Sequence, residues 1–477
     1  MKKNVVPLNP KFPWIITLFE FFFRIFVTLS CCLLFLIFMT HPTIHKFIHT
    51  VVFENHDNWL KCGRKFFENK YCMYTLVPDN WDNEKKNNLQ TTYLYGNPKW
   101  KENLFIVTGG PGGAGFYYFN RFNTFSKNKV NVIFTPQRGI YDSPFYIKCK
   151  DGVSQSCVDQ EKSKLNLKNI LPEQSAKDLI HLTKKHFRDS NNHLLGNSYG
   201  TYLARLIVKM EPKLYTSLIL SNPTYNSIKF NWYLESLDNF LEKCGIECGV
   251  LTPNIIKARL TSWGSLFCQG TSPYNKSRLI KDFYSKLQHS SNHHLMQKFI
   301  YEYFLHCDRN TLPKVVNTLY NHEAEEFDSS LDSKDSYFLF YYITCTLNPH
   351  IYKEHNSNYA QCKYFKEDSI LTEREENLYN LVDFKINIPT LITVGGIDPR
   401  TNLHVAKEIL KDTIDGRLLV FPHLEHSTIP EECNSLVLNQ FITNNSLGIC
   451  LEHKYNVLYS KNNNLLAHDS ENSHTVY

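Results

Sequence analysis

The sequence predicts an α/β protein with a doubly wound, mostly parallel sheet and a large, mainly helical insertion. From about residue 91, short apolar runs alternate with helical patterns, which is typical of strand–helix units. The runs are continuously apolar, as expected of parallel strands buried on both faces. The alternation stops between residues 223 and 388 and then resumes. A chain of 477 residues with 42% hydrophobic and 21% charged residues can bury such a core.

The N-terminal segment is the first predicted element. Residues 1–12 contain three lysines, and residues 13–39 are apolar apart from Glu20 and Arg24, so the stretch is long enough to span a bilayer. The upstream lysines place residues 1–12 in the cytoplasm and the rest of the chain outside the cell or in a lumen. We expect an uncleaved signal-anchor. A cleaved signal peptide, with residues 25–39 as its apolar region, is the alternative and would give a secreted protein.

Residues 40–90 are predicted to form an irregular, cysteine-containing lead-in. The chain has 14 Cys, two of them inside the apolar segment, which leaves an even number for an oxidising compartment. Proximity suggests local disulfides without fixing their connectivity: Cys62 with Cys72, Cys149 with Cys157, Cys244 with Cys248 or Cys268, Cys345 with Cys362, and Cys433 with Cys450. Cysteine–histidine spacing typical of zinc is missing, so no metal site is predicted. Asn275 and Asn444 begin glycosylation sequons.

The core is predicted in two parts, residues 91–222 and 389–454, separated by the helical cap over residues 223–388. The apolar runs expected to be strands are Thr91–Tyr95, Leu104–Val107, Val130–Phe134, Leu194–Leu195, Leu218–Leu220, Thr390–Val394 and Leu418–Phe421. The cap has helical patterns at Phe230–Cys244, Leu279–Leu287, His294–Phe304 and Ser336–Ile343. The polar tail, 455–477, is expected to be disordered. The net charge of +6 is scattered, which argues against nucleic-acid binding.

Ser198 carries the first catalytic signal. It lies in Gly196-Asn197-Ser198-Tyr199-Gly200, between an apolar run and a helical pattern. Strand, tight turn and helix are the context of a nucleophile elbow, and the glycines permit the sharp turn. The alternative is an ordinary Gly-flanked turn with a surface serine, because short patterns also arise by chance. We predict that Ser198 is a nucleophile and that the Tyr199 N–H is one donor of an oxyanion hole.

A glycine-rich loop follows the strand Leu104–Val107. It reads Thr108-Gly109-Gly110-Pro111-Gly112-Gly113-Ala114-Gly115, and its glycines would let backbone N–H groups approach a substrate oxygen. We predict that Gly109, Gly110, Pro111 and Gly112 form the oxyanion loop, with Gly110 as the donor. A phosphate-binding loop is the alternative, but the Gly-Lys-Ser/Thr ending is missing.

The acid and base are predicted from the last two strands. Asp398 lies in a Gly-rich turn after Thr390–Val394, where an Asx-turn or helix N-cap is the alternative role. His426 is better placed after Leu418–Phe421, because the loop needs a few residues to swing from the strand toward the serine, and His423 is the alternative base. The chain order Ser198, Asp398, His426 is that of α/β-hydrolases.

These motifs resemble the prolyl iminopeptidase and tripeptidyl aminopeptidase family of α/β-hydrolases. Thr108-Gly109-Gly110-Pro111-Gly112 is similar to the family's His-Gly-Gly-Pro-Gly, and Pro136-Gln137-Arg138-Gly139 to its Asp-Gln-Arg-Gly. The elbow resembles Gly-Gly-Ser-Tyr/Trp-Gly, and the lead-in Trp59…Cys62…Cys72…Val77-Pro78 looks like the secreted branch; the similarity covers residues 59–225 and 386–445. Thr108 and Pro136 depart from the pattern. The family binds the substrate α-amine through acidic cap residues; Glu323, Glu325 and Glu326 are candidates, although a charged helix face is an alternative.

The resemblance implies a serine aminopeptidase that releases residues from peptide N-termini through an acyl-enzyme, with no metal or organic cofactor. An esterase or lipase with the same triad is the alternative, because one fold hosts many substrates. A non-catalytic binding ectodomain is the third possibility. The expected partners are a peptide substrate and, through the N-terminal segment, a membrane.

Overall fold

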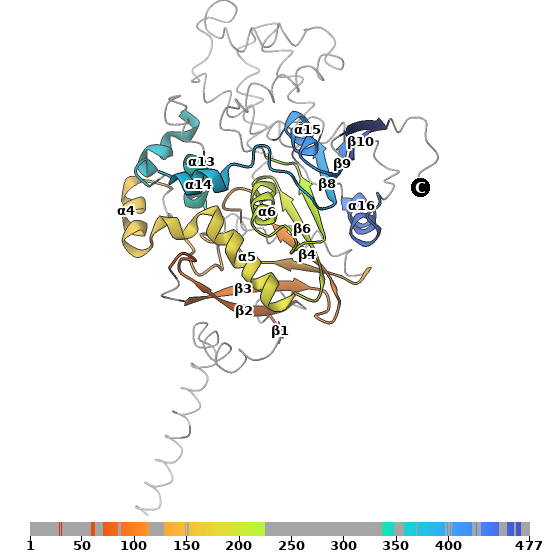
Figure 1. Cartoon of the computed structure of the whole chain (residues 1–477). Helices are drawn as coiled ribbons and strands as arrows, with labels where there is room; N and C mark the ends of the chain where they lie inside the picture. Colours follow the sequence, from red (N-terminus) through yellow and green to blue (C-terminus); the bar gives the residue numbers. More distant parts are fainter. Residues whose placement is uncertain are drawn as a thin grey trace, which may run out of the picture. The chain divides into compact units, whose positions relative to one another are not determined.

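One mixed β-sheet organises the part of the chain that the structure describes (Figure 1). The chain divides into two units, Met1–Asn58 and Trp59–Tyr477, and the sheet belongs to the second. In this computed structural model the described residues are 28, 30, 59–62, 70–83, 87–113, 128–147, 149, 152–224, 336–347, 357–368, 370–395, 398, 401, 403–421, 426, 431–447, 456–461 and 464–468.

The strands form one sheet with a parallel centre and antiparallel edges. Among the described residues the sheet has eleven strands in the order β1-β2-β3-β5-β4-β6-β7-β8-β9-β10-β11. The strands from β5 to β9 in this order are parallel, and the flanking strands pair antiparallel. The bounds are β1 (Leu60–Lys61), β2 (Tyr71–Pro78), β3 (Asn87–Tyr95), β4 (Glu102–Val107), β5 (Val130–Phe134), β6 (Asn191–Asn197), β7 (Ser217–Ser221), β8 (Thr390–Gly395), β9 (Asp415–Phe421), β10 (Asn456–Lys461) and β11 (Asn464–His468).

The central strands are buried because helices pack on the sheet. Every residue of β5, β7 and β8 is buried, which confirms the prediction from their continuous apolar runs. Figure 1 shows α5 and α6 lying over the sheet, and α6 contacts β4, β6 and β7. The helices are α4 (Gln155–Lys164), η3 (Leu167–Ile170), α5 (Pro172–His186), α6 (Tyr199–Met210), α13 (Tyr337–Leu347), η7 (Ser357–Phe365), α14 (Glu373–Tyr379), α15 (Leu403–Lys411) and α16 (Glu431–Asn444).

Two segments that were expected to be irregular are strands. In the lead-in, β2 pairs along its whole length with β3, from Tyr71 opposite Leu94 to Pro78 opposite Asn87. In the polar tail, β10 pairs with β9 and β11 pairs with β10, so the prediction of a disordered tail is wrong there. The physical reason is backbone pairing. A sheet edge presents unpaired N–H and C=O groups that a polar segment can satisfy, and composition does not reveal this.

The described part of the predicted cap is helical. The helix predicted at Ser336–Ile343 corresponds to α13, and η7 and α14 follow it. Within this part, the Phe365 ring packs edge-on against Phe338 and is tilted against Tyr342. The three other helices predicted for the cap and the candidate residues Glu323, Glu325 and Glu326 lie outside the described residues.

Three of the predicted disulfides are formed. They join Cys62 to Cys72, Cys149 to Cys157, and Cys345 to Cys362. The first ties β1 to β2, and the third ties α13 to η7. Short-range bridges of this kind reduce the conformational freedom of the unfolded chain. The other predicted pairs lie outside the residues whose side chains are described.

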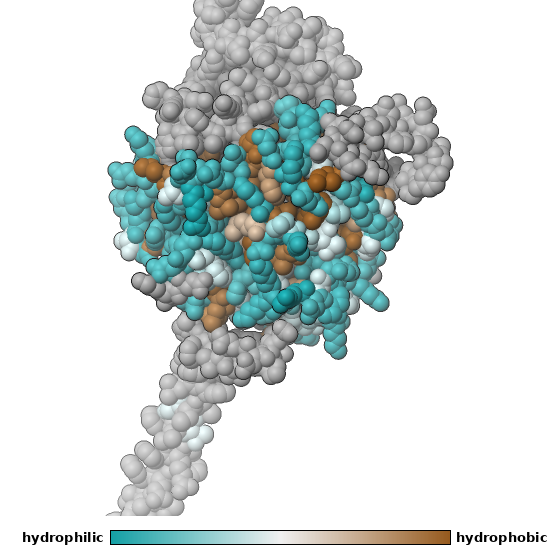
Figure 2. Space-filling model, viewed as in Figure 1, coloured by the Kyte–Doolittle hydropathy of each residue, from teal (hydrophilic) through white to brown (hydrophobic). Residues whose placement is uncertain are grey.

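Of the predicted apolar segment 13–39, only Thr28 and Ser30 are described, and both are helical. Within the described residues, no helix combines the length and the apolar character that crossing a bilayer requires. Hydrophilic residues cover most of the described surface in the view of Figure 2, with smaller hydrophobic groups between them. Asn444 is exposed at the end of α16, and Asn275 lies outside the described residues.

Candidate active site

Ser198 lies at a sharp turn between β6 and α6. Its φ of 52° and ψ of −125° put it in a backbone region that residues with a Cβ rarely adopt. It is the residue that precedes the first helical residue of α6, and its side chain is partly exposed, whereas both neighbours are buried. The strained turn therefore lifts the serine hydroxyl out of the core at the carboxyl edge of the sheet.

Close packing explains the glycines of this elbow. A Cβ on Gly196 would lie 2.4 Å from the carbonyl oxygen of Gly200, and one on Gly200 would lie 2.1 Å from the carbonyl oxygen of Val107. Both distances are far below van der Waals contact with rigid backbone atoms. The helix can start directly against β4 and β6 only because these two positions have no side chain.

His426 connects Ser198 to Asp398. Its Nε2 lies 3.0 Å from Ser198 Oγ, and its Nδ1 lies 2.8 Å from Asp398 Oδ2. These contacts join residues 228 and 28 positions apart in the sequence. The three residues follow β6, β8 and β9, so the parallel sheet brings the carboxyl ends of three strands to one site.

Asp398 is buried and receives several donors. The Thr401 N–H donates to Oδ1 at 3.0 Å, and the hydroxyl of the same residue donates to Oδ2 at 2.5 Å. The Asn222 amide donates to Oδ2 at 2.6 Å. Burial alone would raise the pKa of Asp398, but the charge of His426 and these hydrogen bonds outweigh it and hold the pKa below its usual value. The carboxyl group is therefore ionised at neutral pH and oriented toward the imidazole.

The predicted oxyanion loop lies beside the serine. A Cβ on Gly109 would lie 2.9 Å from Ser198 Cβ and 3.5 Å from Oγ, so the loop backbone passes directly against the nucleophile position. Gly110 is exposed, whereas Gly109, Pro111 and Gly112 are buried. The Tyr199 N–H is the first of α6, where a helix has no internal acceptor for it and its dipole favours negative charge.

Thr108 and Gln137 brace the start of this loop. The Thr108 hydroxyl donates to the carbonyl oxygen of Gly113 at 3.0 Å and so closes the loop on itself. The Gln137 amide donates to the Thr108 carbonyl oxygen at 2.8 Å. Pro136 contributes its carbonyl oxygen, which accepts from Gln90 at 3.1 Å. Neutral hydrogen bonds thus hold the start of the loop at Thr108, while Pro136 is bonded to β3.

Arg138, which follows Gln137 in the chain, is the centre of a buried hydrogen-bond network. Its guanidinium is fully buried and donates to both carboxylate oxygens of Asp178 at 2.7 Å. It also donates to the carbonyl oxygens of Pro78, Asp79 and Asn169 at 2.6–3.0 Å. A buried arginine of this kind needs all these acceptors to compensate its lost hydration. It connects β2 and the region before α5 to the segment that supports the oxyanion loop.

The segments at both ends of the undescribed stretch 225–335 contact the site. Before it, Thr224 N–H donates to the Thr201 hydroxyl at 2.9 Å, and that hydroxyl donates to the Ser198 carbonyl oxygen at 2.6 Å. After it, the Ser336 N–H donates to the Gly112 carbonyl oxygen at 2.9 Å. The insertion therefore leaves the core at the elbow and returns to it at the oxyanion loop.

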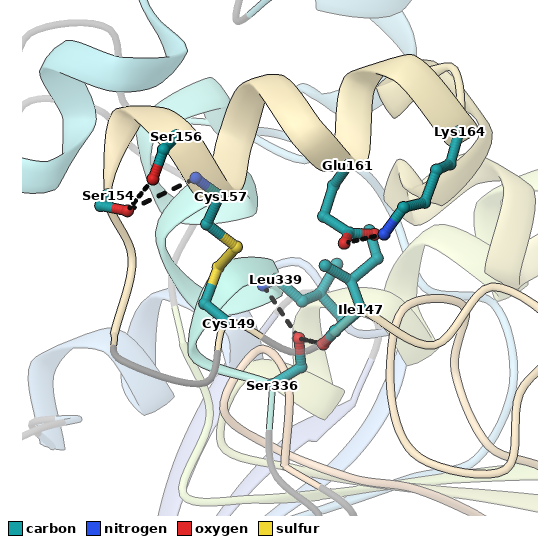
Figure 3. Close-up of a disulfide and its surroundings, with 9 residues drawn as sticks. All are labelled: Ile147, Cys149, Ser154, Ser156, Cys157, Glu161, Lys164, Ser336 and Leu339. Atoms are coloured by element: carbon teal, nitrogen blue, oxygen red, sulfur yellow. Dashed lines mark hydrogen bonds and ion pairs between the residues drawn. A yellow bond between two sulfur atoms is a disulfide. The ribbon is translucent and has the colours of Figure 1, made fainter.

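Figure 3 shows how the returning segment is fastened. The Ser336 hydroxyl donates to the Ile147 carbonyl oxygen at 2.9 Å and accepts from the Leu339 N–H at 3.2 Å, which caps the first turn of α13. The disulfide between Cys149 and Cys157 joins the chain just after Ile147 to α4. The oxyanion loop thus contacts Ser336 at the start of α13, and Ser336 is bonded to a segment that the disulfide links to α4.

The structure brings together Ser198, His426, Asp398 and the Gly109 backbone, while His423 lies outside the described residues. Asp398 also accepts the Thr401 N–H, which is the contact expected of its alternative role in an Asx-turn. The same carboxylate therefore contacts His426 and stabilises the turn. Sequence reasoning missed Asn222, Thr401 and Ser336. The available signal for Asn222 was a polar residue directly after an apolar strand run, at the edge where Ser198 and Asp398 were already expected.

No known protein-family model matches the chain, and no curated protein matches its sequence. Solved structures with similar folds include a proline iminopeptidase from Mycobacterium smegmatis, at 14% identity and a TM-score of 0.39, covering 74% of this chain and 91% of that one. An esterase from Exiguobacterium antarcticum has 13% identity and a TM-score of 0.39, with 78% and 100% covered.

Proposed function

We propose that this chain is a serine hydrolase in which Ser198 is the nucleophile, His426 the general base and Asp398 the acid that orients the base. The observation that carries the proposal is the continuous hydrogen-bonded path Ser198 Oγ–His426 Nε2–His426 Nδ1–Asp398 Oδ2 at a strained elbow. Nucleophile, base and orienting acid within hydrogen-bond reach are the geometric criteria for this chemistry.

In the proposed reaction, Ser198 Oγ bonds to the substrate carbonyl carbon while His426 Nε2 takes the hydroxyl proton. The carbonyl π electrons move to oxygen, and the Tyr199 and Gly110 N–H groups stabilise that oxyanion. His426 then gives its proton to the leaving group as the carbon–leaving-group bond breaks, which leaves an acyl-enzyme. Water attacks the acyl-enzyme by the same route, and Ser198 recovers its proton. Asp398 stays ionised and holds the proton on Nδ1 throughout.

A fluorophosphonate probe tests this mechanism directly. We expect the full chain to be labelled covalently and Ser198→Ala not to be labelled, because an activated serine attacks the probe's phosphorus, expels fluoride and becomes phosphonylated. His426→Ala should reduce labelling to near background. Equal labelling of wild type and Ser198→Ala would show that another residue reacts and would overturn the assignment.

Within the hydrolases, we propose an aminopeptidase that acts on peptide N-termini. The support is the similarity of the Gly109–Gly112 loop and the Gln137–Gly139 motif to those of the prolyl iminopeptidase and tripeptidyl aminopeptidase family. The attachment of the insertion to both the elbow and the oxyanion loop agrees with a cap that restricts access to chain ends. Three disulfides favour an oxidising compartment, and the N-terminal apolar segment would anchor the enzyme or direct its secretion.

A substrate comparison separates this proposal from an esterase. Aminoacyl- and tripeptidyl-amides with a free α-amine should be hydrolysed, and blocking the amine by acetylation should abolish turnover. Short- and long-chain esters serve as the contrast, since the same triad can cleave both bond types. Efficient ester hydrolysis with no amide hydrolysis would reject the aminopeptidase proposal and leave the serine mechanism intact.

A further inference from the structure

The end of β7 contacts two members of the proposed triad, although it contributes none. The Ser198 N–H donates to the Ser221 carbonyl oxygen at 2.9 Å. The next residue, Asn222, donates from Nδ2 to Asp398 Oδ2 at 2.6 Å. One dipeptide therefore sets the backbone of the nucleophile and the side chain of the acid relative to each other.

Asn222 is held in a defined orientation. Its φ of 50° is left-handed, which asparagine tolerates better than most residues, and its N–H donates to the Thr393 carbonyl oxygen at 2.7 Å. The Thr393 hydroxyl donates to Ser221 Oγ at 3.2 Å, and the Ser221 hydroxyl donates to Asn222 Oδ1 at 3.4 Å. Because its oxygen accepts from Ser221, the amide turns its NH₂ group toward Asp398.

Three donors meet at Asp398 Oδ2. The Nδ1 of His426, which is the titratable neighbour, and the neutral Asn222 and Thr401 side chains all lie 2.5–2.8 Å from this oxygen. Donors to a carboxylate stabilise its charged form. They also present positive partial charge beside the imidazole, so the Asp398–His426 pair binds an extra proton less readily.

We propose that Asn222 is a positioning residue of the active site, which holds the Asp398 carboxylate aimed at His426, with Thr401 in the same role. The inference rests on the proposed hydrolase function, because it concerns how the acid of that mechanism is held. Neither residue contacts the reacting serine oxygen in this arrangement.

The test measures the rate of fluorophosphonate labelling of the full chain between about pH 5 and pH 9, the range in which histidine titrates. Asn222→Gly removes the amide while keeping the left-handed backbone accessible. We expect labelling at neutral pH to slow by about 10–100-fold. The acid limb of the pH profile should shift to higher pH by at least about half a pH unit. Thr401→Val should act in the same direction, and Thr401→Ser should restore most of the rate.

Asn445→Gly is the matched control. Asn445 also has a left-handed φ, 49°, and also donates to a carboxylate, Asp415, at 3.3 Å, but at the amino end of β9. It should leave rate and pH profile unchanged. A wild-type rate and acid limb for Asn222→Gly would overturn the inference. So would a slower rate with an unshifted acid limb in both Asn222→Gly and Thr401→Val, since that would indicate a structural role alone. Wild type that is not labelled would instead overturn the proposed function.

Discussion

The two edges of the sheet carry the same residue types in hydrogen-bonded chains. At the carboxyl edge, Ser198, His426 and Asp398 are joined at 3.0 and 2.8 Å. At the amino edge, His193 lies 2.8 Å from Ser217 Oγ through Nδ1 and 3.1 Å from Glu102 Oε2 through Nε2. Distances and residue types alone do not distinguish these serine–histidine–carboxylate chains.

The difference lies in what surrounds each serine. Ser198 follows its strand with a positive φ, is partly exposed, and has the Gly109 backbone beside it and the first N–H of α6 next in the chain. Ser217 is the first residue of β7 and is only 4% exposed. A nucleophile needs space for a carbonyl group and N–H donors for the oxyanion, and parallel strands place helix N-termini at their carboxyl edge. The amino-edge chain is therefore a structural network.

Replacing the two histidines should give the largest contrast. We expect His426→Ala to lower kcat by about 10⁴-fold or more, since members of such a triad act as a unit. His193→Ala should keep the wild-type kcat and lose stability, because Ser217 and Glu102 each lose one hydrogen-bond partner. Steady-state kinetics and thermal melting check both, with His423→Ala as an additional control. A comparable loss of kcat in His193→Ala, measured where the variant is folded, would contradict the comparison.

Replacing the two carboxylates, Asp398 and Glu102, should give the second-largest difference in kcat. Asp398→Asn should lower kcat by roughly 10³–10⁴-fold, because the amide stabilises the wrong imidazole tautomer and not its charged form. Glu102→Gln should leave kcat unchanged.

Glu102→Gln should show its effect in stability against pH instead. The His193 hydrogen bond, opposed by burial, lowers the pKa of Glu102. Such a group contributes stability that is present above its unfolded pKa and is lost as the pH falls through the folded pKa. The melting temperature of Glu102→Gln should thus lie below wild type at neutral pH and converge with it in acid. A constant difference at all pH values would reject this role.

Two glycines extend the comparison to the backbone. Gly109→Ala adds a Cβ 3.0 Å from the Asn197 carbonyl oxygen and 2.9 Å from Ser198 Cβ, so the oxyanion loop must shift. We expect kcat to fall by about 10–100-fold with little change in KM, because a displaced donor is lost in the transition state. Gly416→Ala, at the amino edge, would meet a flexible Leu410 methyl at 2.7 Å. Gly416→Ala should lower the melting temperature and leave kcat unchanged. A loss of kcat in Gly416→Ala with none in Gly109→Ala would contradict the assignment of the active site to the carboxyl edge.

Ser217→Ala should have the smallest effect. Removing one neutral partner from a buried histidine should cost about 1–2 kcal/mol of unfolding free energy. Chemical denaturation measures this value, and fluorophosphonate labelling of Ser198 should proceed at the wild-type rate. Reduced labelling in Ser217→Ala would mean that the two edges are coupled, against the interpretation of the amino edge as purely structural.

Short-range features of the sequence accounted for much of the fold and the site. The apolar runs Leu218–Leu220 and Thr390–Val394 depend on local sterics and burial, and both lie where they were predicted. The tail strand β10 was missed because its pairing with β9 uses backbone groups, which side-chain composition does not encode.

By itself, the sequence determined the order of the strands from β3 to β9, the elbow at Ser198 and the candidates at each strand end, because steric limits and hydrophobic periodicity act over a few residues. Only the tertiary structure decided that His426 meets Ser198 across 228 positions and that Asn222 supports Asp398 across 176. It also distinguished the serine at the carboxyl edge from that at the amino edge. Contacts of this range arise when parallel strands align their ends, and sequence spacing carries no information about that alignment.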